Sequence, residues 1–429
     1  MRSFLLAIGG ARAYDACQDL DFSLKEARRP RVPSVEGGCQ MYGLFEPARI
    51  GTLELRNRFV RSATVESLCT EDGRVTDAYL KSYERLAKGG AGLIVPGNYY
   101  VSRLGRSYPL QTVVDRDEVI DDLKRVVSVV REHGARIVAQ LNHGGRQADP
   151  KIIGERPIGP SAVRDKLSLV KPREMTEDEI EKTIEEFAEG ARRVKEAGFD
   201  GVQIHAAHGY LVNQFLSAYT NRRKDRWGGS LENRMRFLVE VYRAIRARVG
   251  EGYPILVKIN AVDYTKGGVT PEICVTACRK IEELGIAAIE VSGGIAEKGL
   301  STIKGDIPMD LLMQGRTWIE QAGLRLAAKA LRKAAAFEEG YFLPLAAEVK
   351  KHVKVPVLSV GGMRTLARMA EAVEKGWADF ISLCRPLIRQ PNLVRLFEEG
   401  KADASSCTSC NRCSLQILLH RQPMKCYQA

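Results

Sequence analysis

Eight short apolar segments alternate with eight amphipathic helical segments between residues 57 and 398. The expected strands are 59–63, 92–95, 136–141, 201–205, 255–259, 288–291, 355–360 and 380–384. The expected helices are 77–88, 118–133, 177–197, 231–249, 271–284, 344–352, 366–375 and 391–398. Apolar strands that alternate with helices are typical of a parallel sheet covered on both faces. Eight repeats favour a (β/α)8 TIM barrel over an open, doubly wound sheet. A Rossmann or P-loop domain is not expected, because no G-x-G-x-x-G follows a strand and no Walker A motif occurs.

Composition and charge exclude several classes of protein. The 429 residues are 45 % hydrophobic and 28 % charged, which suits a soluble globular protein and not a disordered or collagen-like chain. No stretch holds the roughly 18 uncharged apolar residues that span a bilayer. The net charge is +12, but the basic residues are scattered and no aromatic-rich motif accompanies them. We therefore expect neither a nucleic-acid nor a membrane partner, and an anionic cofactor or substrate suits the charge better.

The two ends of the chain differ from its middle. Residues 1–40 differ from the rest, with a short apolar run followed by irregular polar chain. Ordered patterning begins just after Met41, so we expect a disordered extension or a mis-assigned start. The first residues only weakly imitate a signal peptide, which favours a cytoplasmic protein. We assign 41–400 to the barrel and 401–429 to a cysteine-rich tail.

A long interval, 295–340, separates the sixth strand from its helix. Within it, 315–336 reads as a helix that carries five basic residues. Long insertions at this face of a barrel are commonly substrate loops or lids. The plain alternative is a surface helix that only packs against the barrel.

Polar and glycine residues follow the expected strands where a TIM barrel places its chemistry. Gly361 and Gly362 follow the seventh strand, and Arg385 follows the eighth, which is the usual phosphate site of such barrels. The alternative is a pair of ordinary turn glycines and a surface arginine.

A histidine pair, His205-x-x-His208, ends the fourth strand, and Tyr210 lies two residues beyond. A zinc site is disfavoured, because no glutamate base lies between the histidines and no third ligand is evident. A purely structural pair is the second alternative. We interpret His205 and His208 as N–H donors to a substrate oxygen and Tyr210 as a proton donor.

Residues 43–398 of the sequence resemble the old yellow enzyme family of FMN-dependent oxidoreductases. The matching motifs are Phe45-Glu46-Pro47, Leu55-Arg56-Asn57-Arg58, Gln140-Leu141-x-His143-x-Gly145-Arg146, the run from His205 to Leu216, and Asn221-Arg222-Arg223 with the charged and glycine residues up to Arg234. It is most similar to the branch with an iron–sulfur cluster after the barrel, typified by 2,4-dienoyl-CoA reductase and trimethylamine dehydrogenase.

The resemblance implies a set of FMN contacts, made by Ala63, Thr64, Val65, Gly97, Gln140, Lys258, Gly361, Gly362, Met363, Cys384 and Arg385. Lys258 would place positive charge beside the flavin, which raises its reduction potential. His205 and His208 would polarise the substrate oxygen, and Tyr210 would protonate carbon. Val65 stands where amine dehydrogenases carry a residue bonded to the flavin, so FMN is expected to be non-covalent. No histidine lies in 295–340, unlike the pattern of the dienoyl-CoA reductases.

Four cysteines crowd the C-terminus, with the spacing C-x2-C-x2-C-x12-C at Cys407, Cys410, Cys413 and Cys426. The compact arm lets three thiolates face one cluster, and the later cysteine closes it. The spacing resembles that of trimethylamine dehydrogenase and implies a [4Fe-4S] cluster. A structural zinc site or a pair of disulfides are the alternatives.

These features predict an ene-reductase that transfers hydride from NAD(P)H through FMN to an activated C=C bond. The alternatives are an amine-dehydrogenase-like enzyme that sends electrons out through the cluster, and an electron-transfer subunit without a substrate of its own. A ferredoxin or electron-transfer flavoprotein is the expected redox partner, unless the cluster is only structural. Relatives often form dimers or tetramers, so we expect a homo-oligomer.

Overall fold

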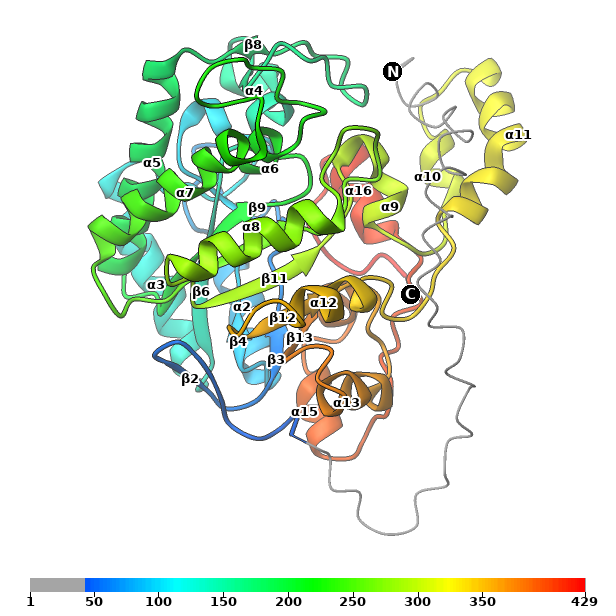
Figure 1. Cartoon of the computed structure of the whole chain (residues 1–429). Coiled ribbons are helices and arrows are strands. Elements are labelled where there is room, and N and C mark those ends of the chain that lie inside the picture. Colours follow the sequence, from blue (N-terminus) through cyan, green and yellow to red (C-terminus); the bar gives the residue numbers. More distant parts are fainter. Residues whose placement is uncertain (1–42, 429) are drawn as a thin grey trace.

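The computed structural model describes residues 43–428, and the predicted extension 1–40 lies outside them. Eight parallel strands close into a barrel, in which β3 pairs with both β4 and β13 (Figure 1). The strands are β3 (Phe59–Arg61), β4 (Leu93–Ile94), β6 (Arg136–Asn142), β9 (Gly201–Ala206), β10 (Ile255–Asn260), β11 (Ala288–Ser292), β12 (Val357–Val360) and β13 (Phe380–Leu383). The predicted (β/α)8 fold and its eight strands are confirmed.

Eight helices follow these strands along the outside of the barrel, as predicted. They are α2 (Asp77–Lys88), α3 (Ile120–Arg131), α5 (Glu177–Glu196), α7 (Leu231–Val249), α8 (Pro271–Glu283), α12 (Leu343–Lys350), α13 (Leu366–Glu374) and α15 (Leu393–Glu398). Side-chain caps fix several of the starts; Thr176 and Glu179 form a reciprocal capping box at α5. The first turn before α3 is instead a 3-10 turn, η4 (Asp117–Val119), so the predicted helix from residue 118 begins later.

A short antiparallel hairpin closes the amino-terminal end of the barrel. Its strands β1 (Ala48–Ile50) and β2 (Leu53–Leu55) pair across a turn at Gly51, whose φ is +56°. Ile50 and Leu55 belong to the apolar cluster that fills the barrel interior beside Val60, Leu256 and Phe380. The polar site must therefore lie at the opposite, carboxyl-terminal end of the strands.

Several further elements were not predicted, and most of them are too short to show a period. They are β5 (Tyr99–Tyr100), η3 (Arg103–Gly105), η5 (Gly145–Gln147), α4 (Pro150–Ile153), β7 (Ile158–Gly159), β8 (Arg173–Glu174), α6 (Leu211–Leu216), η6 (Ala296–Lys298), α14 (Arg385–Arg389) and α16 (Arg412–His420).

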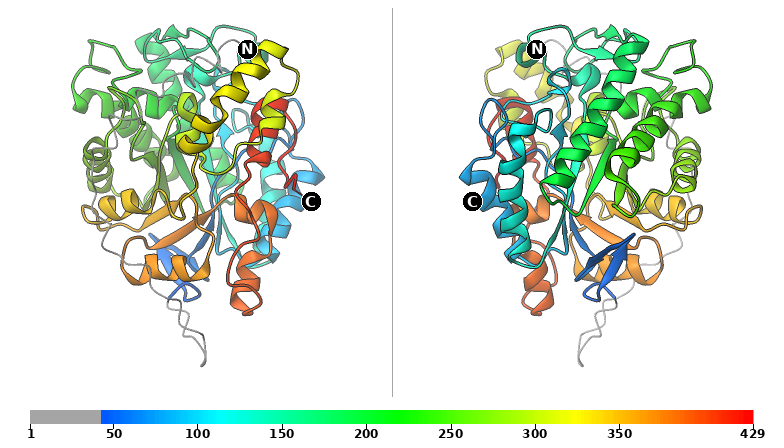
Figure 2. Two further views of the ribbon diagram at one scale, coloured as in Figure 1. Left: turned by 90° about the vertical axis from the view of Figure 1, so that its right-hand side faces the viewer. Right: turned by 90° about the vertical axis from the view of Figure 1, so that its left-hand side faces the viewer.

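The interval between β11 and α12 forms a small helical unit of its own, made of α9 (Gly299–Thr302), α10 (Met309–Met313) and α11 (Trp318–Ala334). Helix α11 corresponds to the helix predicted over 315–336. The C-terminal helix α16 packs beside it, with Leu415 and Leu419 against the cluster that contains Leu312 and Leu324 (Figure 2). No helix within residues 43–428 is long and apolar enough to cross a bilayer.

Candidate active site

One cavity at the carboxyl-terminal ends of the strands gathers almost all of the predicted site residues. It is lined by Ala63, Thr64, Val65, Gln140, His205, His208, Tyr210, Lys258, Gly361, Gly362, Met363, Cys384 and Arg385, together with residues that the sequence did not single out. The insertion adds Thr302 and Ile303 to its wall, and the tail adds Cys413, Ile417 and Met424. The site is therefore covered by both segments that depart from the regular barrel.

Gly97, the remaining predicted flavin contact, is not part of this lining. Its N–H donates to the Glu66 carboxylate at 2.8 Å, and a Cβ there would approach Glu66 Oε2 to 2.3 Å. Tyr83 also donates its hydroxyl to Glu66. Glycine is thus required for a close approach to a buried carboxyl. Burial raises the pKa of Glu66 to about 7, despite the nearby Arg61 and the Gly97 N–H.

A buried polar network crosses the barrel beneath the cavity. The Lys258 ammonium donates to Ser62 Oγ at 2.8 Å and lies 3.6 Å from the Glu290 carboxylate. Gln140 Nε2 donates to Gln203 Oε1 at 2.7 Å, and Gln203 Nε2 donates to Glu290 at 3.0 Å. The neighbouring strands β6, β9, β10 and β11 supply four of these groups, and Ser62 follows β3 on the opposite side of the barrel. The network fixes the orientation of Gln140 and Lys258, which face the cavity.

The two histidines are held as neutral rings. Burial, reinforced by the positive charge of Lys258, lowers the pKa of His208 to about 3. Burial, His208 and Lys258 together hold the pKa of His205 well below its usual range. His205 Nδ1 accepts the Ala207 N–H at 3.4 Å, which leaves Nε2 as the protonated nitrogen. His208 Nε2 lies 2.7 Å from Ser292 Oγ. Neutral rings of this kind can donate a hydrogen bond without adding a charge.

Tyr210 stands beside the histidines, with its ring centroid 4.8 Å from that of His205. Its hydroxyl is 2.8 Å from the hydroxyl of Tyr108, which also lines the cavity. Burial holds the pKa of Tyr210 well above its usual range. Tyr108 belongs to no motif, so the sequence offered no sign of it.

The two glycines at the corner predicted to hold a phosphate also face aromatic rings of this chain. The glycines at 361 and 362 have φ of +128° and +80°. A Cβ on Gly361 would approach Phe342 Cδ2 to 2.7 Å, and a Cβ on Gly362 would approach Tyr341 Cδ1 to 2.7 Å. The glycines therefore admit two aromatic rings of this chain. Arg385 donates to the Lys304 carbonyl at 2.7 Å and also to the side chain of Asn411.

The four tail cysteines line a second, smaller cavity beside the first. Arg385 and Arg389 also line it, and Arg389 Nη1 lies 3.6 Å from Cys426 Sγ. Within residues 43–428, no group of three or more His, Cys, Asp and Glu side chains is arranged to hold a single metal ion. Cys413, Arg385 and Ile388 line both cavities. The two cavities thus share a wall.

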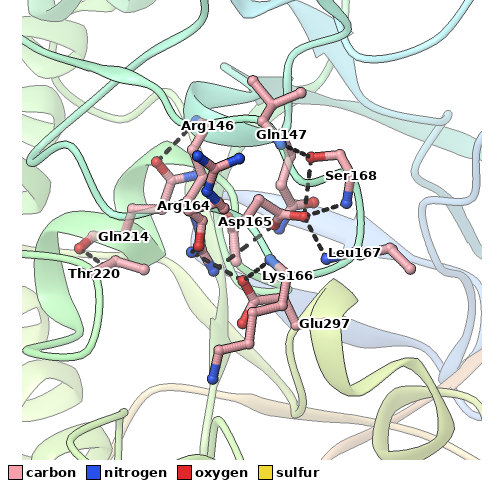
Figure 3. A network of polar contacts seen from close by, with 12 residues as sticks. Arg146, Gln147, Arg164, Asp165, Lys166, Leu167, Ser168, Gln214, Thr220 and Glu297 are labelled. Carbon is pink, nitrogen blue, oxygen red and sulfur yellow. Dashed lines mark hydrogen bonds and ion pairs between the residues drawn. The ribbon is translucent and has the colours of Figure 1, made fainter. Parts of the chain in front are cut away.

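A buried polar network joins three loops of this face (Figure 3). Arg146, from the loop after β6, lies 3.1 Å from Glu297 of the insertion, and both side chains are almost fully buried. The Glu297 carboxylate also accepts the Lys166 N–H at 2.7 Å and the Tyr219 hydroxyl at 2.8 Å. Close by, Ala296 N donates to the His208 carbonyl at 3.3 Å. The network anchors the start of the insertion next to the histidine pair.

Known enzymes resemble this chain over most of its length. It is 36 % identical over 371 residues to an NADH oxidase of Thermoanaerobacter brockii, an alignment that covers 86 % of this chain and 52 % of that protein. It is 36 % identical over 349 residues to an NADPH dehydrogenase of Geobacillus sp. (strain WCH70), covering 81 % of this chain and 91 % of that one. A solved structure of 2-naphthoyl-CoA reductase with 2-naphthoyl-CoA superposes with a TM-score of 0.79 at 29 % identity, covering 90 % of this chain and 56 % of that one.

The chain spans about half the length of several curated relatives that it matches. A family model matches residues 43–296 and 313–404, which include the barrel strands and both histidines. The resemblance seen in the sequence is thereby confirmed, and the chain belongs to the NADH:flavin oxidoreductase / NADH oxidase family.

Proposed function

We propose that this protein is an FMN-dependent oxidoreductase that uses NAD(P)H to reduce a C=C bond conjugated to a carbonyl group. The observation that carries this proposal is one cavity in which two neutral histidines, a tyrosine hydroxyl and a buried lysine meet. The two histidines can hold a carbonyl oxygen, and the tyrosine can give a proton to carbon. The similarity to a reductase solved with an aromatic acyl-CoA supports a conjugated acyl substrate.

The chemistry of the cavity suits FMN. Lys258, on β10, and Arg385, the first residue of α14, supply positive charge to the cavity, which suits an anionic reduced ring and a phosphate. Ser382 lines the cavity with a buried hydroxyl that has no hydrogen-bond partner among the described residues. Gln140 offers its amide to the pyrimidine edge. When bound, FMN would accept a hydride from NAD(P)H and pass it to the substrate.

The remaining contacts follow the family pattern. We propose that the backbone of Ala63, Thr64 and Val65 contacts the flavin ring. Gly97, whose N–H donates to Glu66, is proposed as a further flavin contact. The phosphate corner is assigned to Gly361, Gly362, Met363, Cys384 and Arg385. The aromatic rings of Tyr341 and Phe342 beside the two glycines would then bound this corner.

The tail is proposed to hold a [4Fe-4S] cluster through Cys407, Cys410, Cys413 and Cys426. In such a cluster each thiolate binds a different iron, so the sulfurs lie farther apart than the ligands of one zinc ion, which binds thiolates at about 2.3 Å. All four cysteines line one small cavity, which supports a cluster that they share. Arg385 and Arg389 offset the negative charge of a thiolate-bound cluster.

The wall that the two cavities share supports electron transfer between the cluster and FMN. Cys413 lines both cavities, so electrons would have a short path between the cluster and FMN. The donor to the cluster is proposed to be a ferredoxin or a flavoprotein. The opposite direction of flow, as in an amine dehydrogenase, uses the same path and is distinguished by which substrates reduce the flavin.

Cofactor content tests this proposal. We expect protein purified without oxygen to contain one FMN and about four iron atoms per chain. Cys413→Ser should lose most of the iron and keep FMN, whereas Cys274→Ser, which removes a buried thiol outside both cavities, should keep both cofactors. Wild-type protein that binds FMN but no iron would remove the cluster from the proposal, and protein that cannot bind FMN would overturn the proposal itself.

A further inference from the structure

The hydroxyl of Tyr210 has one phenolic neighbour, Tyr108, at 2.8 Å. The two residues come from different loops: Tyr210 immediately precedes α6, and Tyr108 lies in the loop that follows β5. Both line the cavity, but Tyr210 is 6 % exposed while Tyr108 is only half-buried. Tyr108 is thus the group through which the Tyr210 hydroxyl reaches the more open part of the site.

Hydrogen bonds through Gln111 and Asn98 hold the backbone at Tyr108 in place. Its backbone N–H donates to Gln111 Oε1 at 3.2 Å, and Gln111 Nε2 donates to the Asn98 carbonyl at 3.1 Å. Gln111 and Asn98 are both buried, and Asn98 lines the cavity. A loop tied to the barrel in this way can fix the direction of the Tyr108 hydroxyl.

We propose that Tyr108 is a positioning residue that orients the Tyr210 hydroxyl and returns a proton to it after each turnover. This inference rests on the proposed function. In the step considered, the Tyr210 O–H bond breaks and a C–H bond forms at the carbon next to the substrate carbonyl. The β carbon receives a hydride, whose electron pair comes from NAD(P)H. The Tyr210 phenolate takes the proton of Tyr108, and Tyr108 is reprotonated by water.

The physical reason is the cost of a buried phenolate. An ionised group in a water-poor site is unfavourable unless a hydrogen bond compensates it, and the nearby histidines are neutral. A phenol 2.8 Å away supplies both a hydrogen bond to the new charge and the proton that removes it.

Another tyrosine pair provides a matched control. Tyr79 and Tyr99 place their hydroxyls 2.9 Å apart in the core, and neither lines the cavity. Tyr79→Phe therefore removes the same kind of hydrogen bond as Tyr108→Phe, but away from the site. Tyr210→Phe removes the proposed proton donor itself.

The first measurement needs no turnover. In protein labelled with 13C at tyrosine Cζ, the Tyr210 signal is the one missing from Tyr210→Phe. Its chemical shift reports the hydrogen bonding of the phenol oxygen. We expect Tyr108→Phe to displace this signal and Tyr79→Phe to leave it in place. An unmoved Tyr210 signal in Tyr108→Phe would overturn the inference.

The second measurement separates the inference from the function on which it rests. In Tyr108→Phe we expect enone-dependent reoxidation of the flavin to slow about tenfold and the solvent isotope effect on this reoxidation to increase. The tenfold effect is smaller than the roughly 100- to 10,000-fold that a general acid itself contributes. Slow reoxidation in Tyr210→Phe with wild-type behaviour in Tyr108→Phe would refute the role of Tyr108 alone. Wild-type reoxidation in both variants would refute the proposed proton donor as well.

Discussion

The guanidinium of Arg146 lies 3.1 Å from the carboxylate of Glu297, across two loops that are far apart in sequence. Asp165 Oδ2 lies farther away, 3.9 Å from Arg146 Nη2, so Glu297 is the nearer of two buried carboxylates that face this charge. The Glu297 carboxylate also accepts hydrogen bonds from the Lys166 N–H and the Tyr219 hydroxyl. The pair therefore couples the conformation of the insertion to the loop after β6 (Figure 3).

Glu297→Gln should destabilise the protein markedly, because it leaves the buried Arg146 charge facing only the more distant carboxylate of Asp165. Breaking a buried pair in this way costs about 3–5 kcal/mol. The measurement is the free energy of unfolding in urea. As a control, Glu240→Gln breaks a surface ion pair with Arg243 and should cost at most about 1 kcal/mol. Equal effects of the two substitutions would show that the Arg146–Glu297 pair does not hold these loops.

Acid should destabilise the wild type partly through His208. Its pKa is about 3 in the folded protein, below the ordinary value near 6.5, so between these values the unfolded chain binds a proton that the folded chain does not. Stability therefore falls as the pH drops from about 6.5 toward 3. We expect His208→Gln to lose less unfolding free energy than the wild type between pH 6.5 and 5. The same loss in both proteins would mean that His208 is charged in the folded state.

Glu66 should give the opposite dependence. Its folded pKa of about 7 lies above the ordinary carboxyl value, so the unfolded chain releases a proton first as the pH rises. The stabilisation that the neutral carboxyl contributes is complete below about 4.5 and is lost as the pH rises to about 7. An infrared band of a protonated carboxyl should titrate near pH 7 and be missing from Glu66→Gln. A band absent from the wild type at pH 5 would refute a neutral Glu66.

The Lys258–Glu290 pair should set the midpoint potential of bound FMN. Lys258→Gln removes a buried cation beside the cavity and should lower the potential, whereas Glu290→Gln removes the buried anion next to Lys258 and should raise it. Both potentials can be measured by anaerobic titration with a reference dye. Shifts of the same sign in the two variants would contradict an electrostatic role for the pair.

Much of the fold could be predicted from the sequence, because each βα unit carries its own local signals. The apolar strands and the helices with Thr or Ser caps, such as Thr176 before α5, appear where the pattern places them. The hairpin β1–β2 was missed, since its strands have three residues each and belong to no repeating βα unit. The hairpin closes the end of the barrel through contacts that exist only once the barrel has formed.

The site residues also divide into those that the sequence identified and those that it did not. His205, Tyr210 and Lys258 were found because they follow or occupy predicted strands, and the fold brings the ends of those strands together. Tyr108 and Glu297 were not found, because their partners are over a hundred residues away and no motif marks them. Gly97 shows a further limit: a glycine signals a close approach but not which atoms approach, and here they belong to Glu66.

The most direct test of the central claim is a single anaerobic half-reaction. FMN-loaded protein is reduced with one equivalent of NADPH, cyclohex-2-enone is added, and the flavin absorbance is followed. We predict that the absorbance returns and that one equivalent of cyclohexanone forms. Flavin that stays reduced with the enone, yet is reoxidised at once by a one-electron acceptor, would contradict C=C reduction and indicate an electron-transfer protein instead.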